Sequence, residues 1–287
     1  MNQQAISVII PCLNCREHLS ASLRSVLQQT FPPSEIILID DGSTDSSAEL
    51  AVEVFLESDI PFRILRQSHK GLGAARNCGL ESVHTAWVAL LDADDVWFPN
   101  KLARIVKVLN SSVKKPDLIY HSTRALGGGR DRLCRPVWSV EDILAHGHAP
   151  IPSSCVLRTE SLRKLKGFSE NPAHLGAEDL HLWIRMLRAG MRFERISEFL
   201  GSYRAGGMSS FLSEHLQHVD NVLKDLHRVG YISDEHLRQA RERKQYEAGR
   251  ARHKEGRFPE ALDHYSKVSL DFKALLFKFL ALLRIRK

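Results

Sequence analysis

An apolar run that ends in three carboxylates is the feature that most limits how this chain can fold. Residues 87–98 read Trp-Val-Ala-Leu-Leu-Asp-Ala-Asp-Asp-Val-Trp-Phe. The apolar run has the length of a buried parallel strand. In open α/β sheets, ligands bind at the carboxyl ends of the strands. We therefore predict that a ligand binds at the end of this strand, where the three carboxylates gather. The alternative is an acidic turn that caps the next helix, with Pro99 near the first helical position.

Two of these carboxylates, Asp92 and Asp94, are spaced to share one cation. Side chains two positions apart on an extended segment point the same way. Hard divalent cations prefer carboxylate oxygens, and Mg²⁺ usually takes one or two of them together with substrate phosphates. The spacing therefore predicts a divalent cation next to a phosphorylated ligand.

Strand and helix patterns alternate through the first 120 residues. Apolar runs predict strands over 6–10, 35–40, 62–65 and 87–92. Helical spacing of apolar residues predicts helices between these runs, one of them around 74–80. This alternation is typical of an α/β fold, with a mostly parallel central sheet flanked by helices. We expect residues 1–116 to form a nucleotide-binding half.

The alternation loosens after residue 116. Residues 118–121 and 154–157 resemble strands, and residues 177–189 have the pattern of a helix. Mixed topology with long loops suits an acceptor-binding half over 117–210. Together the two halves make a predicted domain of residues 1–210.

Residues 211–287 have the pattern of an all-α C-terminal extension. Their small and aromatic residues fit a single tetratricopeptide-like helical hairpin: Tyr246, Gly249, Gly256, Phe258, Ala261 and Tyr265. One such repeat cannot bury its own apolar face. We therefore expect residues 211–287 to pack on the preceding domain, on a second copy of the chain or on another protein.

The last segment, residues 272–285, is apolar almost all round, and its charges do not collect on one helical face. Two interpretations remain open. The helix closes the domain as a buried element, or residues 270–287 contact a membrane surface with help from the basic end.

The polar N-terminus has neither a basic segment nor an apolar core of the kind found in signal peptides. No stretch of the sequence has the length needed to cross a bilayer. The expected location is therefore cytoplasmic, with peripheral contact at the cytoplasmic face of the membrane as the variant that the C-terminal segment suggests.

Positive charge is concentrated in the C-terminal extension. The chain of 287 residues carries a net charge of +6, and residues 211–287, with 16 Lys/Arg and 11 Asp/Glu, account for +5. Enzymes that act on nucleic acid usually place positive charge around the active cleft. The nearly neutral first 210 residues argue against a nucleic-acid partner.

Five cysteines do not suggest a disulfide framework. Cys12 and Cys15 form a C-x-x-C pair at the end of the first predicted strand. A redox pair and half of a zinc site are the functional alternatives, but no second C-x-x-C is present. Small apolar filling is the favoured interpretation for both cysteines.

Five motifs follow one another in the order of a known family. The segments are Ser7–Asn14, Ile39–Asp45, Lys70–Asn77, Leu91–Asp95 and Gly176–Leu180. Their ordered combination resembles glycosyltransferase family 2, the inverting enzymes with the GT-A (nucleotide-diphospho-sugar transferase) fold. The resemblance covers about residues 5–205.

The resemblance implies a binding site for a nucleotide-sugar donor. The loop after the first strand, with Pro11 and Asn14, would lie against the base, and Asp41 would accept a hydrogen bond from the uracil ring or a ribose hydroxyl. Turn formation and helix capping are the alternative role for Asp41. Lys70 would reach the diphosphate as a mobile charge. Arg76 is expected to be a structural ion-pair partner, with a phosphate contact as the alternative.

The same resemblance assigns the metal and the base. Asp94 would ligate Mg²⁺ or Mn²⁺, and Asp92 would contact the ribose or the metal, which would neutralise charge on the departing nucleoside diphosphate. The Glu178-Asp179 pair would hold the base that deprotonates the acceptor, with Asp179 preferred over Glu178. Acidic residues are also favourable at a helix start through the helix dipole alone. Asp95 is expected to cap the following helix.

The segment after this helix departs from the family pattern. Many members carry a His after a Tyr-Arg pair, whereas here Tyr203-Arg204 is followed by Ala205-Gly206-Gly207. Water and phosphate would then complete the metal shell, or dependence on metal would be weak. The glycines predict a mobile flap over the donor.

The predicted function is an inverting hexosyl transfer from a nucleotide-diphosphate sugar, first of all a UDP-sugar, to a hydroxyl of a polysaccharide, glycolipid or lipid-linked saccharide in cell-envelope synthesis. The alternatives are a nucleotidyltransferase and a non-catalytic helical-repeat interaction module with a degenerate transferase domain. A nucleotidyltransferase would need a Gly-rich basic loop after the first strand, which residues 12–16 do not provide.

Overall fold

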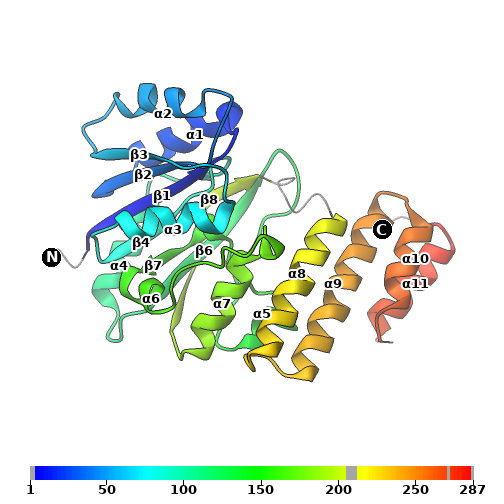
Figure 1. The fold of residues 1–287 in the computed structure, drawn as a ribbon. Helices are drawn as coiled ribbons and strands as arrows, with labels where there is room; N and C mark the ends of the chain where they lie inside the picture. Colours follow the sequence, from blue (N-terminus) through cyan, green and yellow to red (C-terminus); the bar gives the residue numbers. More distant parts are fainter. Residues whose placement is uncertain (1–3, 205–211, 270–271, 286–287) are drawn as a thin grey trace.

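One twisted sheet of eight strands organises the molecule (Figure 1). The computed structural model describes residues 4–204, 212–269 and 272–285. The strand order is β3-β2-β1-β4-β7-β6-β8-β5. The strands are β1 (Ile6–Cys12), β2 (Glu35–Asp40), β3 (Phe62–Arg66), β4 (Trp87–Leu90), β5 (Val96–Trp97), β6 (Leu118–Leu126), β7 (Val156–Arg158) and β8 (Phe193–Arg204).

Parallel pairing dominates the first half of this sheet. Strands β3, β2, β1 and β4 are parallel neighbours, whereas β7 runs antiparallel to both β4 and β6. Strand β8 is parallel to β6, and β5 closes the edge antiparallel to β8. The predicted α/β fold with a mostly parallel sheet is confirmed.

Helices cover both faces of the sheet and continue beyond it (Figure 1). They are α1 (Arg16–Leu27), α2 (Ser47–Phe55), α3 (Leu72–Ser82), α4 (Lys101–Ser111), α5 (Val140–Leu144), α6 (Thr159–Lys164), α7 (Glu178–Arg188), α8 (Leu212–Arg228), α9 (Asp234–Lys254), α10 (Phe258–Ser266) and α11 (Phe272–Leu282). Two short 3₁₀ helices are η1 (Pro152–Ser154) and η2 (Pro172–His174).

The alternation of side chains along β1 creates two separate cores. Val8 and Ile10 pack with residues of α1 and α4 on one face, whereas Ile9 packs with residues of α3 and α7 on the other. Successive side chains of a strand point to opposite faces, so a strand that is buried on both faces must be apolar throughout. This explains why the run Ile6–Ile10 has no polar alternation beyond Ser7.

Several boundaries differ from the sequence predictions. Strand β4 ends at Leu90, two residues before Asp92, and β6 continues to Leu126, five residues beyond its predicted end. The long strand β8 had no prediction, because its burial is irregular and its register against β6 shifts twice near Ser122. The predicted flap after Arg204 and the missing family histidine fall mainly on residues 205–211, which lie outside the described residues.

The predicted helical extension contains two differently packed parts. Apolar residues of α8, among them Val222 and Leu223, belong to the same core as Trp183 of α7. Further along, α9 and α10 pack as a hairpin, in which a side chain at Gly249 would collide with the Tyr265 ring. This close approach is the physical reason for a glycine there. The boundary at residue 210 stays a prediction.

Helix α11 is covered on one side only. Ala281 packs in a small cluster with Tyr265 and Ala261, but Leu276 and Phe279 are exposed. Within the described ranges, none of the helices combines the length and the apolar character that crossing a bilayer requires.

Candidate active site

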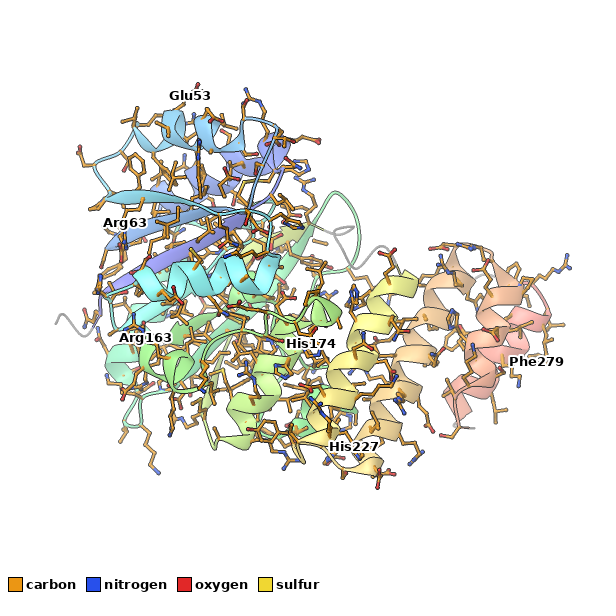
Figure 2. The ribbon with its side chains drawn as sticks, viewed as in Figure 1. Glu53, Arg63, Arg163, His174, His227 and Phe279 are labelled. Atoms are coloured by element: carbon orange, nitrogen blue, oxygen red, sulfur yellow. A yellow bond between two sulfur atoms is a disulfide. The ribbon has the colours of Figure 1, made fainter. Side chains whose placement is uncertain are left out.

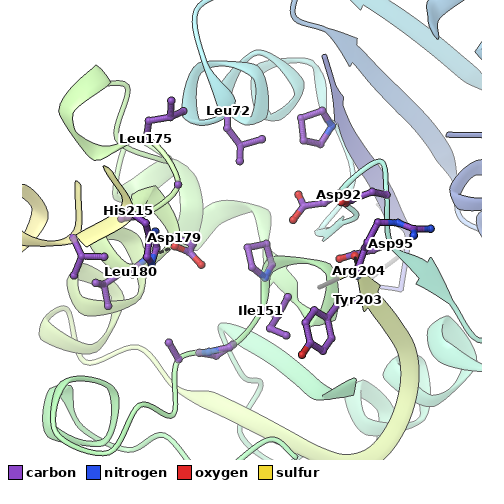
Figure 3. A pocket seen from close by; sticks show the side chains of 18 of the residues that line it. Leu72, Asp92, Asp95, Ile151, Leu175, Asp179, Leu180, Tyr203, Arg204 and His215 are labelled. Atoms are coloured by element: carbon purple, nitrogen blue, oxygen red, sulfur yellow. Dashed lines mark hydrogen bonds between the residues drawn. The ribbon is translucent and has the colours of Figure 1, made fainter. Parts of the chain in front are cut away.

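A cavity of about 1100 Å³ opens at the carboxyl ends of β1 and β4 (Figure 3). Six of the predicted site residues line it: Pro11, Asn14, Asp41, Asp92, Asp94 and Asp179. In Figure 3, Asp92 and Asp95 stand on one side of the opening and Asp179 stands across from them. Lys70, Arg76 and Glu178 are not among the lining residues. The structure therefore gathers carboxylates from separate segments of the chain around one cavity.

Asp41 is held by the loop that follows β3. Its Oδ1 accepts hydrogen bonds from Gln67 Nε2 (2.6 Å) and the Lys70 backbone N–H (2.8 Å). Its Oδ2 accepts from the Gly71 backbone N–H (2.9 Å) and lies 2.8 Å from His69 Nδ1. Burial alone would raise the pKa of Asp41, but these hydrogen bonds lower it below the ordinary value. The carboxylate is therefore ionised at neutral pH and fixes the loop 67–71.

Lys70 takes part in this arrangement through its backbone, while its side chain is exposed. Gly71 follows with a φ of 93°, a conformation that glycine adopts without steric cost, and it directly precedes α3. The loop thus closes the wall of the cavity beside Asp41. A diphosphate contact by the Lys70 side chain stays a prediction.

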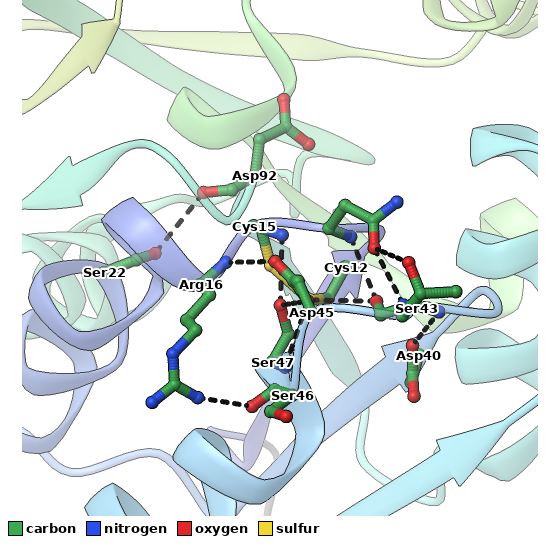
Figure 4. Close-up of a disulfide and its surroundings, with 12 residues drawn as sticks. Cys12, Cys15, Arg16, Ser22, Asp40, Ser43, Asp45, Ser46, Ser47 and Asp92 are labelled. Atoms are coloured by element: carbon green, nitrogen blue, oxygen red, sulfur yellow. Dashed lines mark hydrogen bonds between the residues drawn. A yellow bond between two sulfur atoms is a disulfide. The ribbon is translucent and has the colours of Figure 1, made fainter.

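The loop after β1 is held against the loop after β2 (Figure 4). Asn14 has a φ of 49°, which asparagine tolerates better than most residues, and its Oδ1 accepts from the Thr44 N–H (2.8 Å). The Asn14 backbone N–H donates to Ser43 Oγ (3.0 Å), and the Arg16 N–H donates to Asp45 Oδ2 (3.0 Å). These contacts shape the wall that the resemblance assigns to the base.

The expectation that Cys12 and Cys15 serve as small apolar filling is wrong. The structure joins them in a disulfide, with Cα atoms 6.0 Å apart (Figure 4). Cys12 is still part of the buried core beneath β1, but Cys15 is only partly buried. Two residues stand between the cysteines, and the C-x-x-C spacing allows their sulfur atoms to meet. Both cysteines line the cavity, so the disulfide is a covalent link within its wall.

The three carboxylates of the acidic turn after β4 lie in different surroundings. Asp92 faces the cavity and accepts from Arg76 Nη2 (2.7 Å), and Asp94 is half-buried in the cavity wall. Burial, and then the neighbouring charge of Asp92, raise the pKa of Asp94. Asp95 is buried and accepts from the Arg204 backbone N–H (2.8 Å), which ties the turn to the end of β8.

The prediction that Asp95 caps the next helix is wrong. Strand β5 comes between, and α4 begins only at Lys101, where the flanking Asn100 makes no side-chain cap. Burial, followed by the charge of Asp92, raises the pKa of Asp95 to about 7. The carboxylates of this turn therefore lie close enough to raise one another's pKa.

Arg76 joins the acidic turn to the start of α7. Its guanidinium is 1% exposed and donates from Nη1 to Glu178 Oε1 (2.6 Å) as well as to Asp92. Burial would lower the pKa of Arg76, but the charges of Asp92 and Glu178 raise it overall. The expectation of a structural ion pair matches these contacts. Since Glu178 is buried in this pair, it is placed behind the cavity wall.

Asp179 is the acidic residue of α7 that faces the cavity. Gly176, with a φ of 72°, turns the chain into the helix, and the first turn carries both acidic residues, where the helix dipole favours them. Asp179 Oδ1 accepts from the Leu180 backbone N–H (2.7 Å). Burial, and then the charge of Glu178, raise the pKa of Asp179 to about 7. A carboxylate of this kind is suited to take up a proton near neutral pH.

Sequence reasoning missed the part of the cavity wall that comes from the C-terminal helices. Residues of α8 and α9 line the side near Asp179, among them His215, Leu216 and Lys244. His215 stands near Asp179 in Figure 3. Burial lowers the pKa of His215 to about 4, so the ring is neutral at neutral pH. The sequence offered no signal for this, because the helices come after the last motif of the family.

The fold and this acidic cavity define a glycosyltransferase of the GT-A class. The solved structure of S. aureus TarS superposes with a TM-score of 0.66 at 16% identity, over 98% of this chain and 87% of that one. The Pyrobaculum calidifontis mannosyltransferase in complex with GDP-Man and Mn²⁺ gives 0.65 at 20% identity, over 96% and 79%. At these identities the likeness concerns the fold.

Sequence comparisons point to the same class of enzyme. Residues 7–122 match the model for glycosyl transferase family 2. An E. coli UDP-Glc:alpha-D-GlcNAc-diphosphoundecaprenol beta-1,3-glucosyltransferase, WfaP, is 26% identical over 78% of this chain and 87% of the relative. A glycosyltransferase of Nostoc sp. is 42% identical over 107 residues, which are 37% of this chain and 33% of that relative. The chain is a glycosyltransferase, and residues 7–122 carry its similarity to family 2.

Proposed function

We propose that this glycosyltransferase moves a sugar from a nucleoside-diphosphate donor to an acceptor hydroxyl with inversion. The observation that carries the proposal is the cavity with Asp92 and Asp94 on one side and Asp179, whose pKa is raised to about 7, on the other. An inverting transfer needs one carboxylate on the side opposite to the leaving group. The TarS complexes with UDP and UDP-GlcNAc support UDP as the first nucleotide to test.

Asp92 and Asp94 fit a hard divalent cation. Their oxygens are the ligands that Mg²⁺ and Mn²⁺ prefer, and both carboxylates line the cavity within three positions of one another. A bound Mg²⁺ or Mn²⁺ would act as a Lewis acid toward the diphosphate. Arg76 holds Asp92 in place from behind through its 2.7 Å hydrogen bond.

The remaining roles follow from what each side chain contacts. Asp179 removes the proton of the acceptor hydroxyl, and Glu178 is a positioning residue, since its carboxylate is committed to Arg76. Asp41 supports the wall for the nucleotide by fixing residues 67–71, and the stretch from Pro11 to Asn14 lies against the base. The fourfold contacts of Asp41 favour this supporting role over a direct ribose contact.

We infer that the acceptor is a lipid-linked saccharide. Apolar side chains line the acceptor side of the cavity near Asp179, among them Leu175, Leu180 and Leu216. Two relatives, WfaP and WfgD, are named for transfer to GlcNAc-diphosphoundecaprenol. A sugar next to a lipid diphosphate would present its hydroxyl at Asp179 while the lipid follows the apolar wall.

The exposed side of α11 provides the membrane contact in this proposal. Leu275, Leu276, Phe279 and Leu282 are each at least 43% exposed, and the net charge of +5 over residues 211–287 favours an anionic lipid surface. Such a surface on the cytoplasmic face would bring the enzyme to its acceptor. A second copy or another protein is the alternative occupant.

Donor choice is tested by a panel of nucleotide-sugars, scored by release of the nucleoside diphosphate with and without Mn²⁺. Turnover with a UDP-sugar and an undecaprenyl-diphosphate saccharide, stimulated by the metal, is the expected result. Turnover with none of the donors, or retention at the anomeric carbon of the product, would contradict the proposed reaction.

Membrane contact is tested by flotation with vesicles that contain anionic lipid. The double substitution Leu276→Glu and Phe279→Glu should abolish flotation, whereas Val113→Glu, at a fully exposed residue after α4, should leave it unchanged. Flotation of the double variant at the wild-type level, or none with the wild type, refutes the contact. A change of oligomeric state in the double variant would point to a second copy instead.

A further inference from the structure

Two histidines and one aspartate meet behind the catalytic helix, away from the donor cavity. His174 ends η2, His181 lies on α7, and Asp225 lies on α8. One ligand atom from each lies within 4.8 Å of the others. None of the three lines the cavity that contains Asp179. Figure 2 places His174 where the catalytic part of the chain meets the C-terminal helices.

His174 is oriented for ligation by its own neighbours. Its ring is 3% exposed, and Nδ1 lies 2.8 Å from Ser169 Oγ. Nε2 lies 3.5 Å from the Asn171 amide nitrogen, so an ion bound at Nε2 would take the place of this contact. When one ring nitrogen is bound to an oxygen of the protein, the other is fixed in the tautomer and direction that a metal needs.

His181 and Asp225 bring the other two ligand atoms together. His181 Nε2 lies 3.4 Å from Asp225 Oδ2, and the side chains are 12% and 26% exposed. That separation suits two ligands of one tetrahedral ion, whose bonds are about 2.0–2.2 Å long. His181 Nδ1 is buried with no hydrogen-bond partner in the part of the chain that the structure describes. Asp225 remains partly open to solvent, which gives an ion a way in.

The surrounding charges leave Asp225 Oδ2 available. Arg228 bonds to the other oxygen of Asp225, Oδ1, and so orients the carboxylate from outside. Arg185 donates to the carbonyl oxygens of Leu165 (2.7 Å) and Gly167. The positive charges of Arg185 and Arg228 repel a cation, so only an ion that the three ligands hold tightly would stay bound. Two imidazoles and one carboxylate select Zn²⁺ over Mg²⁺ or Ca²⁺, which prefer shells of oxygen.

We propose that His174, His181 and Asp225 form a Zn²⁺ site, with water as the fourth ligand. The bound ion would link η2 and α7 to α8. Because His181 is two residues from Asp179, an occupied site would fix the start of α7 to the C-terminal helices. Asn221, one turn before Asp225, already ties α8 to η2 by donating to the Ala173 carbonyl (3.1 Å). The site is distinct from the Mg²⁺ or Mn²⁺ site assigned to Asp92 and Asp94.

The test uses the full chain freed of metal with a chelator and then titrated with Zn²⁺ by calorimetry. One equivalent should bind in the wild type and raise Tm. His181→Gln and Asp225→Asn should each weaken Zn²⁺ affinity at least tenfold and remove the rise in Tm. The matched control is His227→Gln, which changes a surface His-Asp pair on α8, the helix of Asp225. This variant should behave as the wild type.

Two further measurements keep the test decisive. Circular dichroism and the metal-free Tm show whether each variant folds, and His181→Cys should restore binding, because a thiolate is a strong Zn²⁺ ligand. Co²⁺ should give the visible spectrum of a tetrahedral complex in the wild type. No Zn²⁺ binding to the folded wild type, or binding lost in Asp94→Asn but kept in Asp225→Asn, overturns the site.

Discussion

Two walls of one cavity contain aspartates whose pKa values are shifted in opposite directions. In the wall beside β2, Asp41 receives four contacts from residues 67–71, and its pKa is lowered. In the wall at the start of α7, Asp179 accepts from the Leu180 N–H, and burial raises its pKa to about 7. A fully bonded carboxylate fixes structure, whereas a sparsely bonded one next to a like charge is ready to exchange a proton. Equal residue types therefore serve different tasks because of their surroundings.

The largest effect is expected from Asp179→Asn. Removal of a positioned base typically costs about 10²–10⁴ in rate, and kcat should fall by this factor while donor affinity stays near that of the wild type. Turnover is measured with saturating donor and acceptor, and donor affinity by calorimetry. Asp263→Asn, at a carboxylate that is 61% exposed on α10, is the control and should keep full activity. A turnover near the wild-type value in Asp179→Asn would remove this residue from the base role.

Arg76→Met should give the largest loss of stability. The substitution leaves the buried Glu178 carboxylate without its partner, and breaking a buried pair costs about 3–5 kcal/mol. The free energy of unfolding is measured in urea. Adding Glu178→Gln to Arg76→Met should recover part of the loss, since the unpaired charge is then gone. Arg124→Met, in an exposed pair with Asp131, should cost less than about 1 kcal/mol. Equal costs at the two sites would contradict the structural role of Arg76.

Asp41→Asn should cost about 1–3 kcal/mol at neutral pH, because the amide cannot accept from all the donors around it. The pKa of Asp41 is lowered in the folded state, so its stabilisation is present above the ordinary value of about 4 and is lost as the pH falls through the lowered value. Urea unfolding at several pH values should show the wild type and the variant converge in acid. Asp59→Asn, at an exposed residue, should show no such convergence.

The smallest effect is the dependence of rate on pH. Because Asp179 must be deprotonated to act as base, kcat/KM should rise about tenfold per pH unit below its pKa of about 7 and level off above it. The profile is measured with one donor and saturating metal. A flat profile through neutral pH would mean that another group removes the proton.

The sequence was most informative where local pattern and global structure agree. The strands β1, β2 and β3 and the helix α7 were predicted within two residues, since apolar runs and helix-start signals are local. Strand β8 was not predicted, because its partner β6 lies more than 60 residues earlier and the pairing shifts register. The meeting of Arg76 with Asp92 and Glu178 also depends on contacts across 16 and 102 positions, although the ion-pair role itself was expected.

Other parts of the site were invisible in the sequence for a physical reason. The walls from α8 and α9 belong to helices whose packing direction no local pattern encodes. The C-x-x-C spacing was compatible with a disulfide, but compositional reasoning favoured packing, and the approach of the two sulfurs depends on the loop conformation at Asn14. The predicted helix-capping role of Asp95 was wrong, because β5 lies between Asp95 and the start of α4.

The shared core of α7 and α8 has a consequence for the newly made chain. Leu182 and Trp183 are packed by Val222 and Leu223, so α7 cannot finish burying its apolar surface before α8 leaves the ribosome. At about 5–20 residues per second, synthesis from residue 178 to residue 228 takes on the order of several seconds. During that interval the nascent polypeptide shows an uncovered apolar patch, which is the kind of surface that chaperones bind.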